Sequence, residues 1–317
     1  MQYMISIPVT PKLITVLGPT AGGKTSFAAN LSHRIGGEII SADSRQVYKR
    51  MNLGTGKDYE DYIVDGERIP VHLIDIAEPG DEYNVFEFQK DFVRAFRNIT
   101  GREKMPILCG GTGLYIEAVL KGYKLIRVPV NHVLRKFLQD KSMVEMTEIL
   151  KSYKKLHNTT DTENRKRLAR AIEIEEYYRS HPKETSDYPD IHTLILGVKF
   201  DRVSRRSRIT ERLKSRLENG MIEEVRQLLD SGIRPEKLIH YGLEYKYITM
   251  YIIGQIDYET MFQKLNTSIH QFAKRQMTWF RSMERQGTDI HWLDGHAPMK
   301  EKIGRSLEVL NKYGLKV

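Results

Sequence analysis

The stretch Leu13–Thr25, LITVLGPTAGGKT, decides the fold. Leu13–Leu17 is a short apolar run that ends at a glycine, and Thr25–Ile35 has the pattern of a helix. Between them, Gly18–Thr25 matches the motif G-x-x-x-x-G-K-[ST]. Its glycines let backbone N–H groups turn inward around phosphate oxygens, and the N-terminus of the following helix adds partial positive charge. The stretch therefore predicts a phosphate-binding loop, or P-loop, between a strand and a helix.

The residue types of this loop suggest individual roles. Lys24 is a mobile cation that can follow a diphosphate, and the Thr25 hydroxyl suits magnesium. We therefore expect Mg²⁺ as the cofactor, with Thr25 as its protein ligand. The motif is also typical of nucleotide binding, ATP included. The expected phosphate-binding residues are Gly18, Pro19, Thr20, Ala21, Gly22, Gly23, Lys24 and Thr25.

Strands and helices alternate through the first part of the chain. After the P-loop helix, the pattern predicts strands at Glu38–Ala42, Val71–Ile76 and Pro106–Cys109, and helices at Phe86–Ile99 and Leu114–Leu120. This alternation indicates a parallel sheet with helices on both faces.

The middle of the chain is different. Val133–Leu156 has apolar residues at helical spacing and no strand candidate, and Asn164–Tyr178 is a further helix. His192–Phe200 then returns to a strand, so the helical material is an insertion into the sheet. We expect a P-loop NTPase-like α/β fold: a parallel sheet flanked by helices, with a small inserted helical subdomain. Its segments are 1–122 and 164–317 for the core and 123–163 for the insertion.

The last part of the chain is mainly helical. An amphipathic pattern predicts one long helix over Arg206–Leu229 and a second over Met261–Met283, and Ile290–Leu293 is a short strand candidate. In the second helix, periodicity places at least one of Trp279 and Phe280 in the core.

Composition excludes several classes of protein. The 317 residues are 40% hydrophobic and 29% charged, which excludes a collagen-like or disordered chain. No apolar run reaches the roughly 18 residues of a membrane span. The first residues lack the pattern of an export signal, and Cys109 has no partner for a disulfide. We therefore expect a cytoplasmic protein without a membrane anchor, acting as a monomer.

The net charge of +9 is unevenly distributed. Residues 1–120 hold 13 basic and 15 acidic side chains, whereas residues 121–317 hold 37 and 26. An excess of basic residues in one part of a chain indicates a polyanionic partner such as a nucleic acid, or an ordinary solvated helix surface.

Two further motifs follow predicted strands. Asp43–Tyr48, DSRQVY, follows the second strand, and Cys109–Tyr115, CGGTGLY, follows the fourth. Parallel strands place their carboxyl ends together, so both motifs should lie on the same edge as the P-loop. Asp43 is a candidate metal ligand, general base or helix N-cap, and the glycine motif is a candidate site element or a tight turn.

A series of motifs in order over residues 18–281 resembles the tRNA dimethylallyltransferase family, also called isopentenyl-tRNA transferases. The motifs are GPTAGGKT, DSRQVYK, MNLGTGK, GGTGLYI, NRKRLARAIEI, ENGMIEEVRQL and AKRQMTWFR. The resemblance implies that the P-loop holds the diphosphate of dimethylallyl diphosphate. It further implies that the dimethylallyl group is transferred to N6 of the adenosine on the 3′ side of the tRNA anticodon, at position 37.

The resemblance also assigns site residues. It makes Asp43 the general base near N6, and it places Thr20 and Arg212 with Lys24 and Thr25 around the diphosphate and its magnesium ion. Asp43, Arg212 and Thr20 are thus the expected catalytic residues. The implied tRNA contacts are Asp43, Ser44, Arg45, Gln46, Lys166, Arg167, Leu168, Ala169, Arg170, Lys274, Arg275, Gln276, Trp279 and Arg281, and the inserted subdomain is expected to contact the anticodon arm.

The sequence departs from the family pattern at two places. Gly56 and Asp58 replace the usual residues around GTxKP, and acidic Glu244 stands where a basic residue is common. Three alternatives remain. A small-molecule or nucleotide kinase would use Asp75 or Asp43 as a magnesium carboxylate. An isopentenyltransferase acting on free adenine nucleotides would not need the basic excess, and a non-catalytic RNA-binding protein would not need both Lys24 and Asp43.

Overall fold

The computed structural model describes residues 10–123, 125, 127–156, 162–181 and 188–315. The chain forms two compact units, Met1–Gly122 with Pro189–Val317, and Tyr123–Tyr188. Residues 1–9, on which the expected absence of an export signal partly rests, lie outside the described part. None of the described helices is long and apolar enough to span a membrane.

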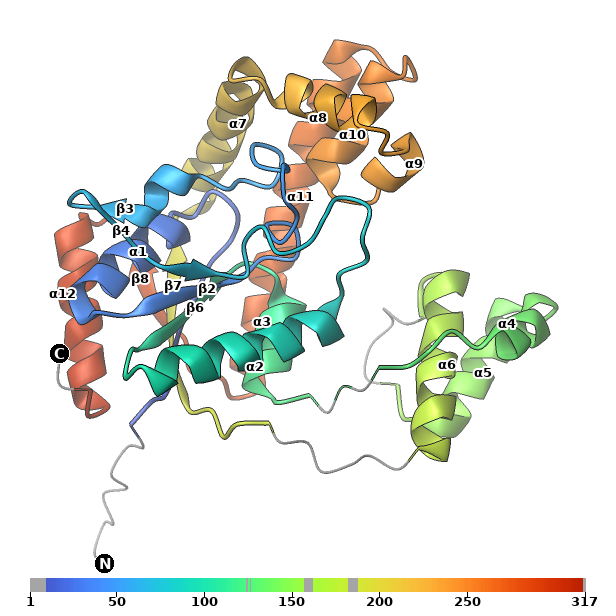
Figure 1. Cartoon of the computed structure of the whole chain (residues 1–317), viewed down its shortest axis with the longest axis horizontal. Coiled ribbons are helices and arrows are strands. Elements are labelled where there is room, and N and C mark those ends of the chain that lie inside the picture. Colours follow the sequence, from blue (N-terminus) through green and yellow to red (C-terminus); the bar gives the residue numbers. More distant parts are fainter. Residues whose placement is uncertain (1–9, 124, 126, 157–161, 182–187, 316–317) are drawn as a thin grey trace, which may run out of the picture. The chain divides into compact units, whose positions relative to one another are not determined.

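The first unit is built on a six-stranded sheet in the order β5-β2-β6-β1-β7-β8. Every pair of neighbouring strands is parallel, so the carboxyl ends of all six lie at one edge, called here the carboxyl edge (Figure 1). The strands are β1 (Leu13–Leu17), β2 (Glu38–Ala42), β5 (Val71–His72), β6 (Pro106–Gly110), β7 (Thr193–Lys199) and β8 (His291–Asp294).

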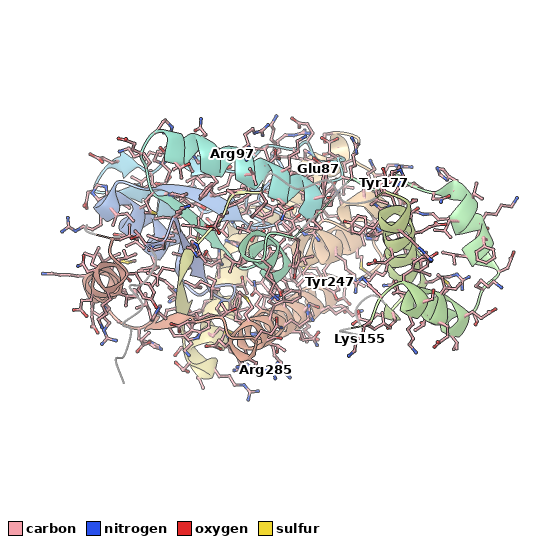
Figure 2. All side chains as sticks on the ribbon, turned by 90° about the horizontal axis from the view of Figure 1, so that it is seen from below. Glu87, Arg97, Lys155, Tyr177, Tyr247 and Arg285 are labelled. Carbon is pink, nitrogen blue, oxygen red and sulfur yellow. The ribbon has the colours of Figure 1, made fainter. Side chains whose placement is uncertain are left out.

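Helices cover both faces of this sheet, as the alternating pattern predicts. Leu13 and Leu17 of β1 pack in one core with α2 (Val85–Gly101), α3 (Gly113–Leu120) and α11 (Tyr258–Arg285). Ile14 and Val16 pack in a second core, with α1 (Lys24–Ile35) and α12 (Met299–Lys312). Successive side chains of a strand point to opposite faces, which explains why β1 is apolar except for Thr15, whose buried hydroxyl bonds Thr193. The charged side chains Glu87 and Arg97 lie along α2 on its outer side (Figure 2).

Several shorter elements complete this unit. The loop after β2 leads into a 3₁₀ turn, η1 (Tyr59–Tyr62), and a small antiparallel hairpin of β3 (Ile63–Val64) and β4 (Glu67–Arg68). A third core forms where α11 packs with four other helices: α7 (Arg202–Glu218), α8 (Met221–Asp230), α9 (Pro235–Leu238) and α10 (Leu243–Ile252). The sequence patterns gave no indication of α10 or α12.

Two predicted elements are shorter than expected. The long helix predicted over Arg206–Leu229 is wrong, because Gly220 has φ of 96° and separates α7 from α8. Glycine adopts this left-handed conformation at little cost. The strand predicted over Val71–Ile76 ends at His72, because Leu73 and Asp75 also have positive φ angles and turn the chain toward the loop after β2.

The second unit is a three-helix insertion of α4 (His132–Gln139), α5 (Met143–Tyr153) and α6 (Arg165–Ser180). Its core includes Leu138, Leu150, Leu168 and Ile172. The predicted end of the insertion at residue 163 is therefore wrong: α6 buries its apolar face against α5 and belongs to the inserted unit, which extends to Tyr188.

A buried carboxylate joins the sheet to its flanking helix. The Glu38 side chain at the start of β2 is only 6% exposed, and it pairs with the Arg102 guanidinium and, at 2.8 Å, with His72 Nε2. The hydrogen bonds from Arg102 lower the pKa of the Glu38 carboxyl despite its burial. The pair thus stabilises the folded state while Glu38 is ionised.

We predict that Glu38→Gln destabilises the protein by about 1.5–3 kcal/mol at neutral pH, because it replaces charge-assisted hydrogen bonds with neutral ones. The pKa is lower in the folded state, so the contribution is complete above the unfolded pKa near 4.3 and is lost as pH falls through the folded value. Urea unfolding at pH 7 and at pH 3 checks this. A destabilisation of equal size at both pH values would contradict it.

Candidate active site

A cavity of about 1420 Å³ opens at the carboxyl edge of the sheet, within the first unit. The loops that follow β1, β2, β6, β7 and β8 all contribute to its lining, and α7, α10 and α11 supply side chains from the other sides. The P-loop from Thr20 to Thr25, Asp43 and Arg212 all line it. Ligand sites in parallel α/β sheets lie at this edge, so the sequence motifs converge where the topology requires.

The P-loop leaves backbone donors free for an anion. Gly22 donates to the Pro19 carbonyl at 3.1 Å, which closes the turn, and Gly23 adopts φ of 70° at the N-cap of α1. No side chain caps this helix end, and its first turn contains no acidic residue. The unpaired N–H groups and the helix dipole therefore favour a phosphate group at this position.

Gln276 on α11 fixes the P-loop from the side. Its Oε1 accepts from the Thr20 backbone N–H at 2.8 Å, and its Nε2 donates to the Gly111 carbonyl at 2.9 Å. The side chain is only 7% exposed. Gln276 thus couples the loops after β1 and β6. It lines the cavity with both ends of its amide bonded, and its expected role as a tRNA contact stays a prediction.

Asp43 lies at the end of β2 and faces the same cavity. Its Oδ1 accepts from the Arg45 backbone N–H at 2.9 Å, while the adjacent Ser44 N–H donates to Thr112 Oγ1 at 3.3 Å. Among the described residues, no hydrogen bond to Asp43 Oδ2 is formed. The carboxylate is thus held by its own turn and retains an oxygen that can accept a proton from a bound group.

Opposite the P-loop, two arginines of α7 share one carboxylate. Arg212 donates to Asp58 Oδ2 at 2.7 Å, and Arg216 donates to Asp58 Oδ1 at 2.9 Å. We call Arg212 and Arg216 the arginine pair. Burial would raise the pKa of the Asp58 carboxyl, but the two guanidinium groups outweigh it and hold that pKa below its usual value. The arginine pair also affects Lys24. Burial lowers the pKa of the Lys24 ammonium, Asp43 raises this pKa, and the arginine pair lowers it.

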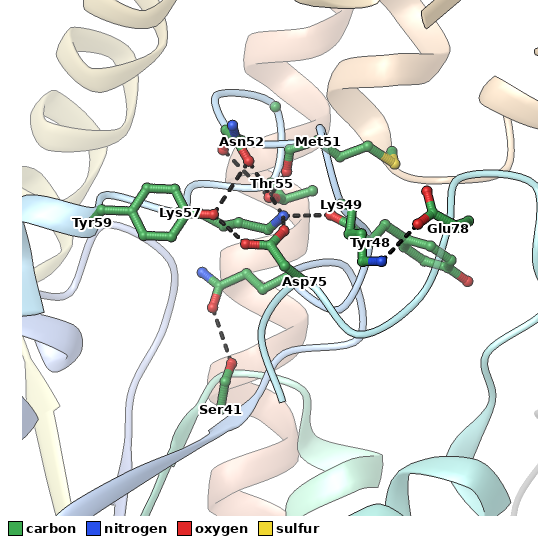
Figure 3. Close-up of polar contacts among 12 residues, drawn as sticks. Ser41, Tyr48, Lys49, Met51, Asn52, Thr55, Lys57, Tyr59, Asp75 and Glu78 are labelled. Atoms are coloured by element: carbon green, nitrogen blue, oxygen red, sulfur yellow. Dashed lines mark hydrogen bonds and ion pairs between the residues drawn. The ribbon is translucent and has the colours of Figure 1, made fainter. Parts of the chain in front are cut away.

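A buried polar network supports the loop that carries Asp58 (Figure 3). Lys57, whose side chain is fully buried, pairs with Asp75 and donates to the Tyr48 carbonyl, and Tyr59 also donates to Asp75. Asp75 is therefore engaged in holding this loop, and it does not line the cavity. A magnesium-binding role for Asp75, one of the two carboxylates open to the kinase alternative, does not fit this placement.

The second departure from the family pattern also faces the cavity. Glu244 at the start of α10 lines it, and burial raises the pKa of its carboxyl, while Arg216 and Arg212 lower it. A basic residue at this position would add charge to a region that already holds the arginine pair, so an acidic residue balances the local charge.

The residues expected to contact tRNA fall into two groups. Ser44, Arg45, Arg275 and Trp279 line the cavity, while Lys274 and Arg281 are exposed on α11 outside it. Phe280 is fully buried and Trp279 is 38% exposed, as helix periodicity predicts. Gln46 also lines the cavity, but it is only 9% exposed and bonds Ser41 Oγ at 3.0 Å and the Gly56 carbonyl at 3.1 Å, so its role as a tRNA contact stays a prediction.

The remaining candidates lie on α6 of the inserted unit. Lys166, Arg167 and Arg170 line a separate concave region of about 400 Å³ with Lys154. Leu168 is fully buried in the core of that unit, so its side chain is not available to RNA, whereas Ala169 is only partly buried against that core and stays a candidate. Residues one or two positions along a helix from an exposed basic residue lie on a different face of the helix.

Sequence reasoning missed Arg216, Asp58 and Glu244 as parts of the site. A signal for Arg216 was present, because it follows Arg212 by four residues, the spacing that places two side chains on one helix face. Asp58 and Glu244 were noticed only as departures from a pattern. Their partners lie more than 25 residues away in sequence, and only the folded chain reveals them.

Comparison with known proteins agrees with this geometry. The model of the IPP transferase family matches residues 46–283, and that of an isopentenyl transferase family matches residues 11–78. A tRNA dimethylallyltransferase of Phocaeicola vulgatus is 58% identical over 299 residues, which cover 94% of this chain and 97% of that protein.

Solved structures have the same fold. The tRNA isopentenylpyrophosphate transferase of Bacillus halodurans superposes with a TM-score of 0.70 at 29% identity, covering 96% of this chain and 97% of that one. A eukaryotic dimethylallyltransferase acting on tRNA superposes with a TM-score of 0.75, covering 95% of this chain and 79% of that one. Its sequence identity is 23%, so this likeness supports the fold alone. The family model covers most of the chain and the bacterial relative nearly all of it; the chain therefore belongs to the tRNA dimethylallyltransferase, or IPP transferase, family.

Proposed function

We propose that this protein transfers a dimethylallyl group from dimethylallyl diphosphate to N6 of adenosine 37 of tRNA, releasing diphosphate. The observation that carries the proposal is the convergence of three groups on one cavity: the open P-loop, the Asp43 carboxylate and the arginine pair. A diphosphate leaving group needs cations and N–H donors, and an amine nucleophile needs a carboxylate. Both are present at the same edge of the sheet.

The diphosphate is bound by the backbone N–H groups of the P-loop and by Lys24, with Arg212 approaching from the opposite side. As the bond between the prenyl carbon and the diphosphate oxygen breaks, negative charge accumulates on the leaving group. Fixed donors and cations around it stabilise that charge without reorganisation. The Thr20 backbone N–H is engaged by Gln276 on α11, so Thr20 would contribute its side-chain hydroxyl to this set.

Asp43 accepts the proton that N6 loses as the new carbon–nitrogen bond forms. An exocyclic adenine amine is a weak nucleophile, and a positioned base typically accelerates such a step by about 10²–10⁴. The adenosine must leave its stack to reach Asp43, so a deep cavity is needed. Arg275 and Trp279 line that cavity and suit the backbone and the flat face of a nucleotide.

Magnesium fits the donors present at the P-loop. Mg²⁺ prefers oxygen ligands and keeps several waters, so one hydroxyl together with substrate phosphates is a sufficient protein contribution. Thr25 lines the cavity beside Lys24 and would supply that hydroxyl. When bound, the ion would neutralise part of the charge on the diphosphate.

The basic side chains outside the cavity are proposed to hold the tRNA by its phosphates. Lys274 and Arg281 on α11, and Lys166, Arg167 and Arg170 on the inserted unit, are the candidates. We further propose that the protein acts as a monomer in the cytoplasm, where its substrate tRNA is present. Any ATP binding would use the same P-loop.

The test of the proposal is a transfer assay with labelled dimethylallyl diphosphate and unmodified tRNA. Label should appear in the tRNA as N6-dimethylallyladenosine. Parallel reactions with AMP as the prenyl acceptor and with ATP as a phosphoryl donor address the alternatives. Transfer to AMP alone would favour the free-nucleotide enzyme, and transfer of the ATP γ-phosphate without prenyl transfer would favour a kinase.

We predict that Lys24→Ala lowers the rate of transfer by about 10²–10³, because it removes one cation from the leaving group. The affinity for tRNA should stay nearly unchanged. Arg34→Ala, an exposed position near the end of the same helix, is the matched control and should behave as wild type. A loss of tRNA affinity as large as the loss of transfer rate in the Lys24 variant would contradict the division of the site into diphosphate and RNA regions.

We predict that Asp43→Asn slows transfer by about 10²–10⁴ while both substrates still bind. Asparagine can still accept from the Arg45 N–H, so the turn after β2 should survive. Single-turnover rates with pre-bound tRNA check this. A variant with the wild-type rate would leave Asp43 only its role in the turn.

We predict that replacing Lys274, Arg275 and Arg281 together with Ala makes tRNA binding less sensitive to salt. The slope of log affinity against log salt concentration should become shallower by about two to three units, since each lost phosphate contact reduces that slope by roughly 0.7–0.9. Binding of diphosphate at fixed magnesium should change little and is the internal control. An unchanged slope would place the RNA elsewhere, with the basic face of α6 as the remaining candidate.

A further inference from the structure

Asp58 is the only carboxylate in the described part of the cavity that pairs with the arginines of α7. Each of its oxygens bonds one arginine, at 2.7 Å for Arg212 and 2.9 Å for Arg216. The Arg216 side chain is 14% exposed, so its charge is largely removed from water. Two guanidinium groups one helical turn apart repel each other, and a shared counter-charge offsets that repulsion.

The backbone beside Asp58 is shaped for the same pair. A Cβ atom on Gly56 would lie 2.7 Å from Arg216 Nη2 and 2.9 Å from Arg212 Nη2, so both guanidinium groups rest against this residue. Gly56 also has φ of 75°, which favours glycine. The two residues that depart from the family pattern here, Gly56 and Asp58, are thus the two that contact the arginine pair.

The loop is held rigidly from the other side. The Glu224 carboxylate of α8 accepts three backbone N–H groups, from Asn52 at 2.8 Å, Leu53 at 2.7 Å and Gly54 at 3.0 Å. The buried Lys57–Asp75 pair fixes the residue directly before Asp58 (Figure 3). Asp58 therefore meets the two arginines from a loop that is anchored on its other side.

We propose that Asp58 is a positioning residue: it orients Arg212 toward the diphosphate site and, as a competing anion, limits how tightly the arginine pair holds diphosphate. The inference rests on the proposed function for the identity of the ligand. A guanidinium already paired with a carboxylate binds a second anion less strongly than a free one, because part of its charge and two of its donors are engaged. Release of the diphosphate product is faster as a result.

The test measures binding and turnover separately in Asp58→Asn. With Mg²⁺ present, inorganic diphosphate should bind about five- to tenfold more tightly than to wild type, because the opposing charge is gone. Turnover with dimethylallyl diphosphate and tRNA should fall about tenfold, because Arg212 is no longer oriented. A general structural defect would instead lower both the diphosphate affinity and the turnover rate. Glu60→Gln removes the same charge from an exposed position in η1 outside the cavity and should change neither.

A charge-restoring double variant extends the test. Asp58→Asn combined with Arg216→Gln removes one anion and one cation, so diphosphate affinity should return to within about twofold of wild type while turnover stays low. Wild-type or weaker diphosphate binding in Asp58→Asn would overturn the proposal, as would diphosphate binding in the double variant that is as tight as in Asp58→Asn alone. If wild-type protein failed to transfer the prenyl group to tRNA, the proposed function would fail, yet the diphosphate measurements would still decide the role of Asp58.

Discussion

The parallel direction of all six strands is the constraint on which the rest of the structure depends. It places every strand end, and so every loop that follows a strand, at one edge of the sheet. The P-loop, Asp43 and Thr112 follow three different strands, and the parallel arrangement of these strands is enough to bring them together at this edge. Burial on both faces requires the strands to be mainly apolar, with their few polar side chains paired, which leaves the loops at this edge as the place where the sheet can present polar chemistry.

Charge balance shapes the cavity that forms at this edge. Lys24, the arginine pair and the carboxyl groups of Asp58 and Glu244 all line the cavity, and the arginine pair holds the pKa of Asp58 low, so that this carboxylate offsets part of the positive charge. Without such carboxylates, three partly buried cations would repel one another and destabilise the fold. The same carboxylates weaken anion binding, so a site of this kind is suited to release its product. Catalysis gains most from interactions that strengthen as charge develops on the leaving group.

The sequence predicts those features that depend on local pattern. The strands Leu13–Leu17 and Glu38–Ala42 have their predicted bounds, because buried strands next to glycine-rich loops are short and clearly delimited. The unbroken helix predicted over Arg206–Leu229 and the prediction that α6 belongs to the core were wrong, since periodicity alone reports neither a left-handed residue nor the surface against which a helix packs. Gln276 was expected to contact RNA because the resemblance places it in a tRNA-contacting stretch; only the fold reveals that it holds the P-loop.

A co-crystal structure with an unreactive thio-analogue of dimethylallyl diphosphate and Mg²⁺ tests the central claim most directly. The account predicts that the diphosphate lies against the backbone N–H groups of the P-loop and Lys24, with Arg212 on its far side and the prenyl carbon turned toward Asp43. Diphosphate bound away from the P-loop, or a prenyl group turned away from Asp43 in the ordered complex, would contradict the account.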